Sequence, residues 1–215
     1  MSVSVSMALP LLSIAGAVAL GAVSPGPSFL MVARTAVAHS RAHALAAAAG
    51  MGVGGVLFAL AALLGLQALL LAVPVLYVLL KLCGGAYLLY LGMRLWRGAR
   101  HALSVPMAAP PPRAQTRLHA FSLALATQLS NPKAAIVYAS VFAAFLPRQP
   151  PPALSVLLPM IIFVIESGWY AIVAVALSAA APRAAYLSAK GWVDRIAGSV
   201  MMLLGVKLIA TAHQA

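Results

Sequence analysis

Residues 44–71 contain no charged side chain, although a helix needs only about 20 predominantly apolar residues to cross a membrane. The whole chain of 215 residues is similarly apolar: 64% of it is hydrophobic and 7% is charged. Soluble domains carry about 25% charged residues, and a fold of this size cannot bury so much apolar surface behind so few charges. The sequence therefore predicts an integral membrane protein.

Six apolar runs follow one another along the chain, each separated from the next by a shorter polar segment. They are residues 7–33, 44–71, 75–96, 118–145, 153–181 and 193–212. Their length favours helices over the strands of a membrane barrel, which need only about 9–11 residues. The predicted fold class is an all-α membrane protein with six transmembrane helices. The first run has no basic residues before it, so we expect no cleaved signal peptide there.

The fourteen Lys and Arg residues far outnumber the two acids and give a formal net charge of +12. They are scattered between the apolar runs rather than gathered into a dense basic face, so no nucleic-acid partner is expected. Most of them lie in alternate loops, at residues 34–41, 94–117 and 183–195, and the other loops are almost free of them. The positive-inside rule places the basic loops in the cytoplasm and both termini on the opposite side.

Two distant segments share one pattern: a base, a glycine three residues later, an apolar stretch, and then Gly-x-base-Leu. These segments are residues 81–95 and 195–208, with one residue of slippage between them. A proline break also recurs, as Ser-Pro-Gly-Pro at residues 24–27 and as Ser-Asn-Pro-Lys at residues 130–133. The recurrence indicates that the chain consists of two related halves.

Each half contains three predicted spans, and this odd number means that the second half enters the membrane from the opposite side. Residues 1–97 and 118–215 are therefore predicted to form two inverted three-helix repeats within a single transmembrane domain. A cytoplasmic linker, residues 98–117, joins them and contains three consecutive prolines. Inverted repeats with broken helices are typical of secondary transporters, which bind substrate between the halves and expose it to each side in turn.

The first proline break predicts backbone groups that are free to bind a ligand. Proline has no N–H and clashes with the carbonyl four residues back, so Pro25, Gly26 and Pro27 are expected to open the first helix. Lipid cannot satisfy the carbonyls and amides that are freed, and such backbone is tolerated only against protein, water or substrate. A half-helix N-terminus also suits a carboxylate. These three residues are predicted to bind substrate.

Polar side chains gather at the second break. Thr127 and Asn131 lie four residues apart and are expected to share a helix face, and Pro132 and Lys133 follow at once. Lys133 is about halfway along its span, where a lysine costs about 2.5–3.5 kcal/mol to insert and is a functional candidate by default. Its structural alternative is to cap carbonyls that Pro132 frees.

Glu166 is the one acid near the centre of a predicted span, and Tyr170 follows one helical turn later on the same face. Glu166 could pair with Lys133, carry a proton, or bind the ammonium group of a substrate. The other acid, Asp194, is predicted near the cytoplasmic end of the sixth span. Glu166 and Tyr170 complete the predicted substrate site.

These motifs together resemble one known family. Residues 24–27, residues 84–92 (Gly-Gly-Ala-Tyr-Leu-Leu-Tyr-Leu-Gly) and residues 131–133 match, in order and spacing, the LysE/RhtB or lysine exporter family. The resemblance covers nearly the whole chain. It implies a bacterial inner-membrane protein with periplasmic termini that exports amino acids or close derivatives, driven by the proton motive force. Glu166 resembles the acid typical of the fifth helix, although aspartate is more usual there.

The resemblance does not select a substrate, but combined with the residue pattern it suggests roles for the candidate residues. The opened first helix, with Asn131 and Lys133, would hold the substrate carboxylate, and Glu166 would bind the ammonium group or exchange a proton for it. A neutral amino acid is favoured, because a basic one would favour a second acid near the site. The expected partners are an amino acid, protons and membrane lipid, without a cofactor, and a homodimer is left open.

The main alternative is an exporter of metal or other inorganic ions with the same architecture. It would require intramembrane histidines, cysteines or clustered acids, whereas the five histidines lie in loops, span ends or the tail and Cys83 is the single cysteine. His39 and His43 lie four residues apart, but two ligands alone do not predict a metal site. An enzyme is not expected, because no nucleophile is accompanied by an intramembrane base.

Overall fold

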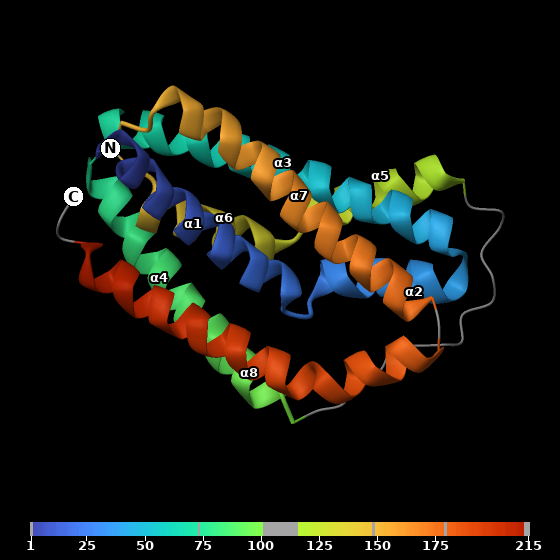
Figure 1. Ribbon diagram of the computed structural model, residues 1–215. Coiled ribbons are helices and arrows are strands. Elements are labelled where there is room, and N and C mark those ends of the chain that lie inside the picture. The colour runs from blue at the N-terminus through green and yellow to red at the C-terminus, as the bar shows by residue number, and fades with distance from the viewer. Residues whose placement is uncertain (1, 73, 101–115, 148, 179, 213–215) are drawn as a thin grey trace.

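A computed structural model describes residues 2–72, 74–100, 116–147, 149–178 and 180–212, and all regular secondary structure in these ranges is helical (Figure 1). The helices of this described part are α1 (Ser2–Val23), α2 (Pro27–Ala38), α3 (Arg41–Ala72), α4 (Pro74–Gly98), α5 (Arg117–Leu129), α6 (Pro132–Phe145), α7 (Pro152–Leu177) and α8 (Ala180–Ala210). The all-α prediction is confirmed for these residues. Most of the predicted linker, including its three prolines, lies outside them.

The first five predicted runs match α1 to α7 to within five residues at each end, but α8 begins much earlier than predicted. It starts at Ala180 rather than at residue 193. The intervening segment contains charges such as Arg183, which exclude it from an apolar run without preventing a helix. Pro182 is tolerated because it lies in the first turn, where its missing N–H has no helical partner to lose. As a result Asp194, predicted near the end of a span, lies about halfway along α8.

Both predicted helix breaks are confirmed. The first separates α1 from α2 at residues 24–26, and the two helices are bent by 54° relative to one another. The second separates α5 from α6 at residues 130–131. Pro27 and Pro132 each lie in the first turn of the helix that follows, where proline costs no hydrogen bond. The prolines therefore end one helix and begin the next.

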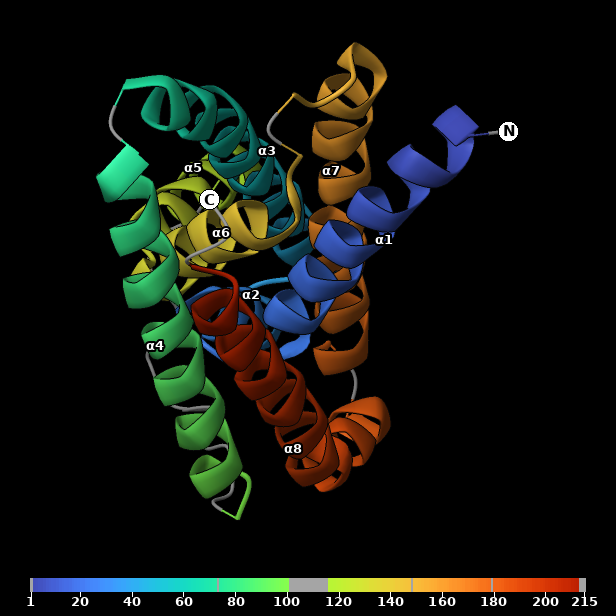
Figure 2. The ribbon, with the colours of Figure 1, turned by 90° about the vertical axis from the view of Figure 1, so that its left-hand side faces the viewer.

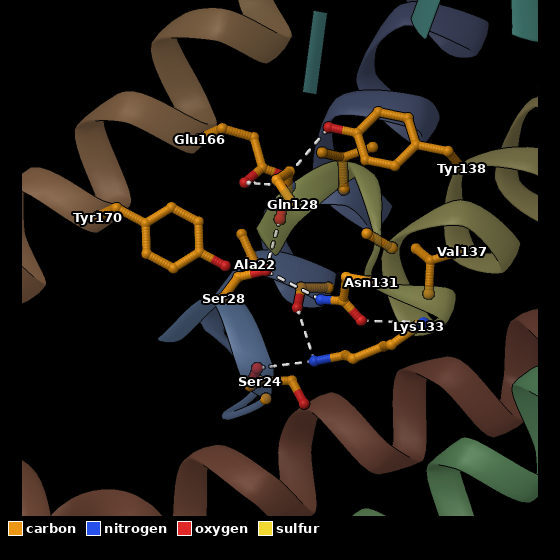
Figure 3. A pocket seen from close by; sticks show the side chains of 14 residues that line it. Ala22, Ser24, Ser28, Gln128, Asn131, Lys133, Val137, Tyr138, Glu166 and Tyr170 are labelled. Carbon is orange, nitrogen blue, oxygen red and sulfur yellow. Dashed lines mark hydrogen bonds between the residues drawn. The ribbon is translucent and has the colours of Figure 1, made fainter. Parts of the chain in front are cut away.

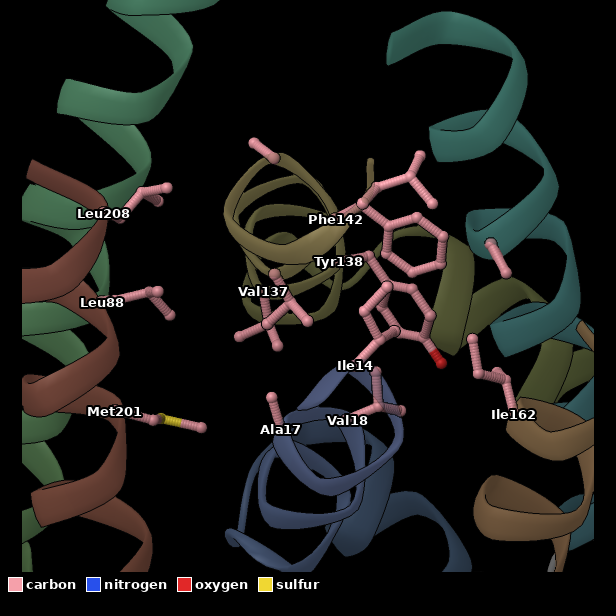
Figure 4. Packing of buried hydrophobic residues seen from close by; sticks show 14 of the residues in the cluster. Ile14, Ala17, Val18, Leu88, Val137, Tyr138, Phe142, Ile162, Met201 and Leu208 are labelled. Carbon is pink, nitrogen blue, oxygen red and sulfur yellow. The ribbon is translucent and has the colours of Figure 1, made fainter. Parts of the chain in front are cut away.

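The helices form two groups with α1 and α6 between them (Figures 1 and 2). On one flank α4 lies beside α8, and on the other α3 packs against both α5 and α7. Leu88 of α4 and Met201 of α8 point toward Ala17 of α1 and Val137 of α6, and Phe142 of α6 extends this buried cluster toward α3 (Figure 4). The helices α1 and α6, which adjoin the two breaks, are therefore held in the middle of the bundle.

Four glycines allow α4 and α8 to approach closely. A Cβ atom on Gly198 would lie 2.7 Å from the carbonyl oxygen of Gly92, and a Cβ atom on Gly205 would lie 2.6 Å from that of Gly85. Backbone, rather than a flexible side chain, occupies the space that any larger residue would need. Small residues at helix contacts in membranes serve this purpose, so these positions require glycine as long as α4 and α8 stay in contact.

Gly198→Ala is expected to destabilise the protein, because the added methyl group forces α4 away from α8 and overpacking costs about 1–3 kcal/mol. Gly168→Ala in α7 is the matched control, since a Cβ atom there meets nothing within 4 Å. The Gly168→Ala control should therefore be at least as stable as the wild type, because alanine favours a helix over glycine by about 1 kcal/mol. Thermal unfolding of both purified variants in detergent measures the difference. Equal melting temperatures would contradict the close approach of the two helices.

Within the described residues, two helices are individually long and apolar enough to cross a membrane: Arg41–Gly65 of α3, and α7. The bent pair of α1 and α2 makes a third if it is counted as one span. Large apolar side chains are exposed on the outside of the bundle, among them Leu64 and Val164, as suits a surface that faces lipid. The predicted number of six spans stays a prediction.

Candidate functional site

A small cavity lies where the two helix breaks meet (Figure 3). The end of α1, the start of α2, the α5–α6 break and the middle of α7 enclose it. Its lining residues are Val18, Gly21, Ala22, Ser24, Gly26, Ser28, Gln128, Asn131, Lys133, Ala134, Val137, Tyr138, Glu166 and Tyr170. Two breaks that are far apart in the sequence therefore direct their polar groups toward one common space.

Lys133 connects the two breaks. Its ammonium group donates hydrogen bonds to the carbonyl oxygens of Ser24 at 2.7 Å and Gly21 at 3.2 Å. Pro25 has no N–H, so the carbonyl of Gly21, four residues earlier, loses its helical partner, and Lys133 replaces that partner from α6. The predicted capping of carbonyls by Lys133 is observed, but these carbonyls belong to the first break and are not those freed by Pro132.

A continuous row of hydrogen bonds links Lys133 to Glu166. The side-chain oxygen of Asn131 accepts from the backbone N–H of Lys133 at 3.0 Å, and its amide nitrogen donates to the Ser28 hydroxyl at 2.9 Å. Ser28 donates to the side-chain oxygen of Gln128 at 2.5 Å, and the amide nitrogen of Gln128 donates to the Glu166 carboxylate at 3.4 Å. Buried polar groups from both halves of the chain thus satisfy one another.

Glu166 lies at the far end of this row and is 3% exposed. Its carboxylate accepts a further hydrogen bond from the Tyr138 hydroxyl at 3.0 Å. The pairing of Glu166 with Lys133, one of the alternatives that the sequence left open, is not formed, because the Lys133 ammonium is directed at the two carbonyls. Glu166 is thus a buried carboxylate held by two neutral donors, an arrangement that only partly compensates its charge.

The cavity brings together most of the predicted site residues. Those that line it are Gly26, Asn131, Lys133, Glu166 and Tyr170. Pro25, Pro27 and Pro132 are not in its lining, and they contribute by forming the two breaks that give the cavity its polar walls.

Thr127 lies apart from the other predicted site residues. Its hydroxyl donates to the carbonyl of Leu123 within α5 at 2.7 Å, and it does not line the cavity. The prediction that Thr127 shares a helix face with Asn131 is wrong, because α5 ends at Leu129 and helical spacing does not continue past that point. The next residue, Gln128, lines the cavity in its place.

Ser28, Gln128 and Tyr138 were not predicted as site residues. Gln128 could have been found from its position within an apolar span, since intramembrane polar side chains are costly without partners. Tyr138 lies seven residues after Asn131, two turns along the same face. No comparable signal in the sequence identifies Ser28, because its role in the site depends on a hydrogen bond to Gln128, 100 residues away.

The cavity is small, with about 20 Å³ of space for the centre of a water molecule, which is enough for about one water. The Ser24 hydroxyl is buried beside it and has no hydrogen-bond partner among the described residues. An amino acid does not fit in this space. The structure therefore represents a closed arrangement of the site, and a larger ligand requires the surrounding helices to separate.

Within the described part of the chain, no three His, Cys, Asp or Glu side chains gather into a possible metal site. The rings of His39 and His43 have their centroids 5.8 Å apart, and the Ser40 hydroxyl lies 2.7 Å from Nδ1 of His43. His39 and Ser40 lie between α2 and α3, and His43 lies in the first turn of α3.

A family model for LysE type translocators matches residues 19–212, which run from the second half of α1 to the end of α8. The chain belongs to the LysE family. This membership confirms the resemblance drawn from the sequence motifs. Two of the three motifs of this LysE protein, residues 24–27 and 131–133, form the breaks at the cavity, and the third, residues 84–92, supplies two of the glycines between α4 and α8.

Curated relatives match this LysE protein over most of its length. A threonine efflux protein of Escherichia coli is 32% identical over 186 residues, which are 86% of this chain and 90% of that protein. A homoserine/homoserine lactone efflux protein of Salmonella typhimurium is 28% identical over 194 residues, 88% of this chain and 91% of that protein. An uncharacterized membrane protein of Pseudomonas aeruginosa is 37% identical over 148 residues, 68% of each chain. No solved structure matches the chain.

Proposed function

We propose that this protein exports amino acids or close derivatives across a bacterial inner membrane. The observation that carries the proposal is the buried cavity between two broken helices, with the Lys133 ammonium on one side and the Glu166 carboxylate on the other. A zwitterionic amino acid presents a charge of the opposite sign to each of them. The similarity to efflux proteins named for threonine and for homoserine supports the proposal.

The substrate carboxylate is proposed to bind at the first turn of α2, beside Lys133. The N-cap residue of α2 is Gly26, which has no side chain for capping, whereas the N-cap residue of α6, Asn131, caps its own helix. A helix N-terminus without a side-chain cap suits a carboxylate. An ammonium group has three donors, of which Lys133 uses two on carbonyls. The third is left for an anion.

Glu166 is proposed to bind the substrate ammonium group and, in its absence, a proton. Its carboxylate receives hydrogen bonds from the neutral side chains of Gln128 and Tyr138. A proton or an ammonium group would relieve the cost of burying this charge. Competition between the two at one carboxylate would couple export to proton entry. Tyr170, one turn along α7, lines the space where the rest of the substrate would lie.

Six spans and two inverted repeats, residues 1–97 and 118–215, are proposed for the architecture, with α1–α2 and α5–α6 each counted as one broken span. Support comes from the contact between α4 and α8. The same offset of 113 residues relates Gly85 to Gly198 and Gly92 to Gly205. Gly85 packs against Gly205, and Gly92 packs against Gly198. The offset therefore maps the contact between Gly85 and Gly205 onto the contact between Gly198 and Gly92, and the reverse.

The neighbouring side chains follow the same exchange. Leu89 packs against Gly205, and Met202, its counterpart by the same offset, packs against Gly92. Reciprocal contacts of this kind are the property of a two-fold axis. An axis in the membrane plane would relate the two broken spans as well, and transporters with inverted repeats bind their substrates between such spans. Rocking of the two repeats would then open the closed cavity to the cytoplasm and to the periplasm in turn.

An export assay tests the proposed function. Bacteria that lack their own exporters are loaded with dipeptides, and the release of each amino acid is followed with and without this protein. We expect several-fold faster release of neutral amino acids such as threonine than of lysine, and a protonophore should abolish the acceleration. Equal release of every amino acid with and without the protein would contradict amino-acid export. Acceleration that survives the protonophore would contradict the proton coupling alone.

A further inference from the structure

A hollow lined by arginines and tryptophans lies at one end of the α4–α8 pair. Trp96, Arg97 and Arg100 line it from the end of α4 and the residues just after it, and Trp192 and Arg195 line it from α8. Its volume is about 690 Å³, and it shares no residue with the cavity at the helix breaks. Figure 2 shows the end of α4 and the neighbouring part of α8 close together.

The arginines of this hollow have no acidic side chain to pair with. The sequence contains two acids, Glu166 and Asp194. Glu166 lies in the cavity, and Asp194 is 2% exposed and pairs with Lys190 at 2.7 Å. Lys190 also donates to the Gly98 carbonyl at 3.0 Å, so this buried pair belongs to the helix contact. Three guanidinium groups around one hollow therefore leave it open to an anion from outside the chain.

In the proposed six-span architecture, on which this inference rests, the tryptophans place the hollow at a membrane surface. Trp96 comes 22 residues after the start of α4, which is about 33 Å along a helix and matches a hydrocarbon layer about 30 Å thick. Trp96 is 47% exposed and Trp192 is 68% exposed, as is typical of tryptophan at the headgroup level. Trp96 donates to the Ser199 hydroxyl at 2.9 Å, and the Arg195 guanidinium lies 5.4 Å from the centre of the Trp192 ring. These contacts hold the rim of the hollow in place.

We propose that this hollow binds the phosphate group of an anionic phospholipid, with Arg97, Arg100 and Arg195 as its ligands. The planar guanidinium group matches phosphate oxygens in bidentate hydrogen bonds. Met93, one helical turn from Arg97, and Ile196, one helical turn from Trp192, are exposed apolar side chains on the side of the hollow toward the middle of the membrane. They offer the acyl chains a path along α4 and α8 that a soluble phosphate would not use. The lipid would therefore join two helices that belong to different halves of the chain.

The test uses the purified full-length protein, titrated in detergent with phospholipids that carry bromine on their acyl chains. Bromine quenches tryptophan fluorescence at short range, so a bound lipid is detected directly. We expect brominated phosphatidylglycerol to quench at several-fold lower concentration than zwitterionic brominated phosphatidylethanolamine. Inorganic phosphate should not displace it. The triple variant Arg97→Gln, Arg100→Gln, Arg195→Gln should bind the anionic lipid more weakly by roughly fivefold per arginine removed.

The matched control removes three exposed arginines elsewhere, as Arg34→Gln, Arg41→Gln, Arg117→Gln, and should bind the lipid as the wild type does. If both triple variants bind the lipid equally weakly, binding depends on the overall charge of the protein, and the proposed lipid site is wrong. Displacement of the lipid by inorganic phosphate would assign the hollow to a soluble anion instead. If the first triple variant does not fold, the wild-type titrations decide, because equal quenching by both lipids overturns the proposal. None of these outcomes depends on what the protein transports.

Discussion

Lys133→Ala is expected to lower amino-acid export by about ten- to hundredfold, which corresponds to the loss of a charged hydrogen bond worth about 1.5–3 kcal/mol. The proposed substrate carboxylate loses its cationic ligand. The carbonyls of Gly21 and Ser24 also lose the donor that replaces their helical partners. Initial export rates from dipeptide-loaded cells measure the effect, normalised to the amount of protein in the membrane.

Two further lysine variants separate binding from structure. Lys133→Gln retains hydrogen-bond donors for the carbonyls but has no charge for a carboxylate, so it should reach the membrane and still export poorly. Lys207→Gln in α8 is the matched control, because Lys207 is exposed and lies 4.2 Å above the ring of Phe145, outside the cavity. It should export at the wild-type rate. Wild-type export by Lys133→Gln would reduce Lys133 to a structural cap of the first break.

The sequence predicts both helix breaks because proline and glycine act on the backbone locally. Pro25, Pro27 and Pro132 constrain their own segment whatever packs around it, and the breaks occur at these residues. Hydropathy locates most helix ends for a similar reason. It fails at the start of α8, because Arg183 and Lys190 interrupt the apolar run there without interrupting the helix. An apolar run indicates burial in lipid rather than helix formation.

The hydrogen-bond partners of the site residues cannot be predicted from the local sequence. Lys133 donates to carbonyls more than 100 residues earlier in the chain, and no periodicity in the sequence encodes that contact. The sequence identified Lys133 and Glu166 by their cost within a membrane, yet it left open whether they pair. The prediction for Thr127 failed for a local reason. It assumed that helical spacing continues from Thr127 to Asn131, whereas the helix ends between them, at Leu129.

Glu166→Gln is expected to lower proton-driven export by about ten- to hundredfold, because glutamine can neither hold a proton reversibly nor offer a charge to an ammonium group. The fold should be retained with a small change in stability. Glutamine keeps an oxygen that accepts from the Tyr138 hydroxyl, and burying a neutral amide costs less than burying a carboxylate; against this, its amide nitrogen replaces the oxygen that accepts from Gln128. Thermal unfolding of the purified variant measures its stability, and export from cells measures the loss of transport.

The Glu166 carboxylate has two proposed partners, a proton and the substrate ammonium group. An assay of amino-acid exchange across the membrane distinguishes them. Glu166→Asp keeps a carboxylate at a shorter reach and should retain part of the export rate, so it is the matched control. If Glu166→Gln still exchanges labelled for unlabelled amino acid but no longer exports against a gradient, Glu166 carries the proton rather than the ammonium group. Loss of exchange as well assigns substrate binding to Glu166, because a substrate that is not bound cannot be exchanged. Export by Glu166→Gln that still accelerates when the outside is acidified would place proton coupling on another group of the chain.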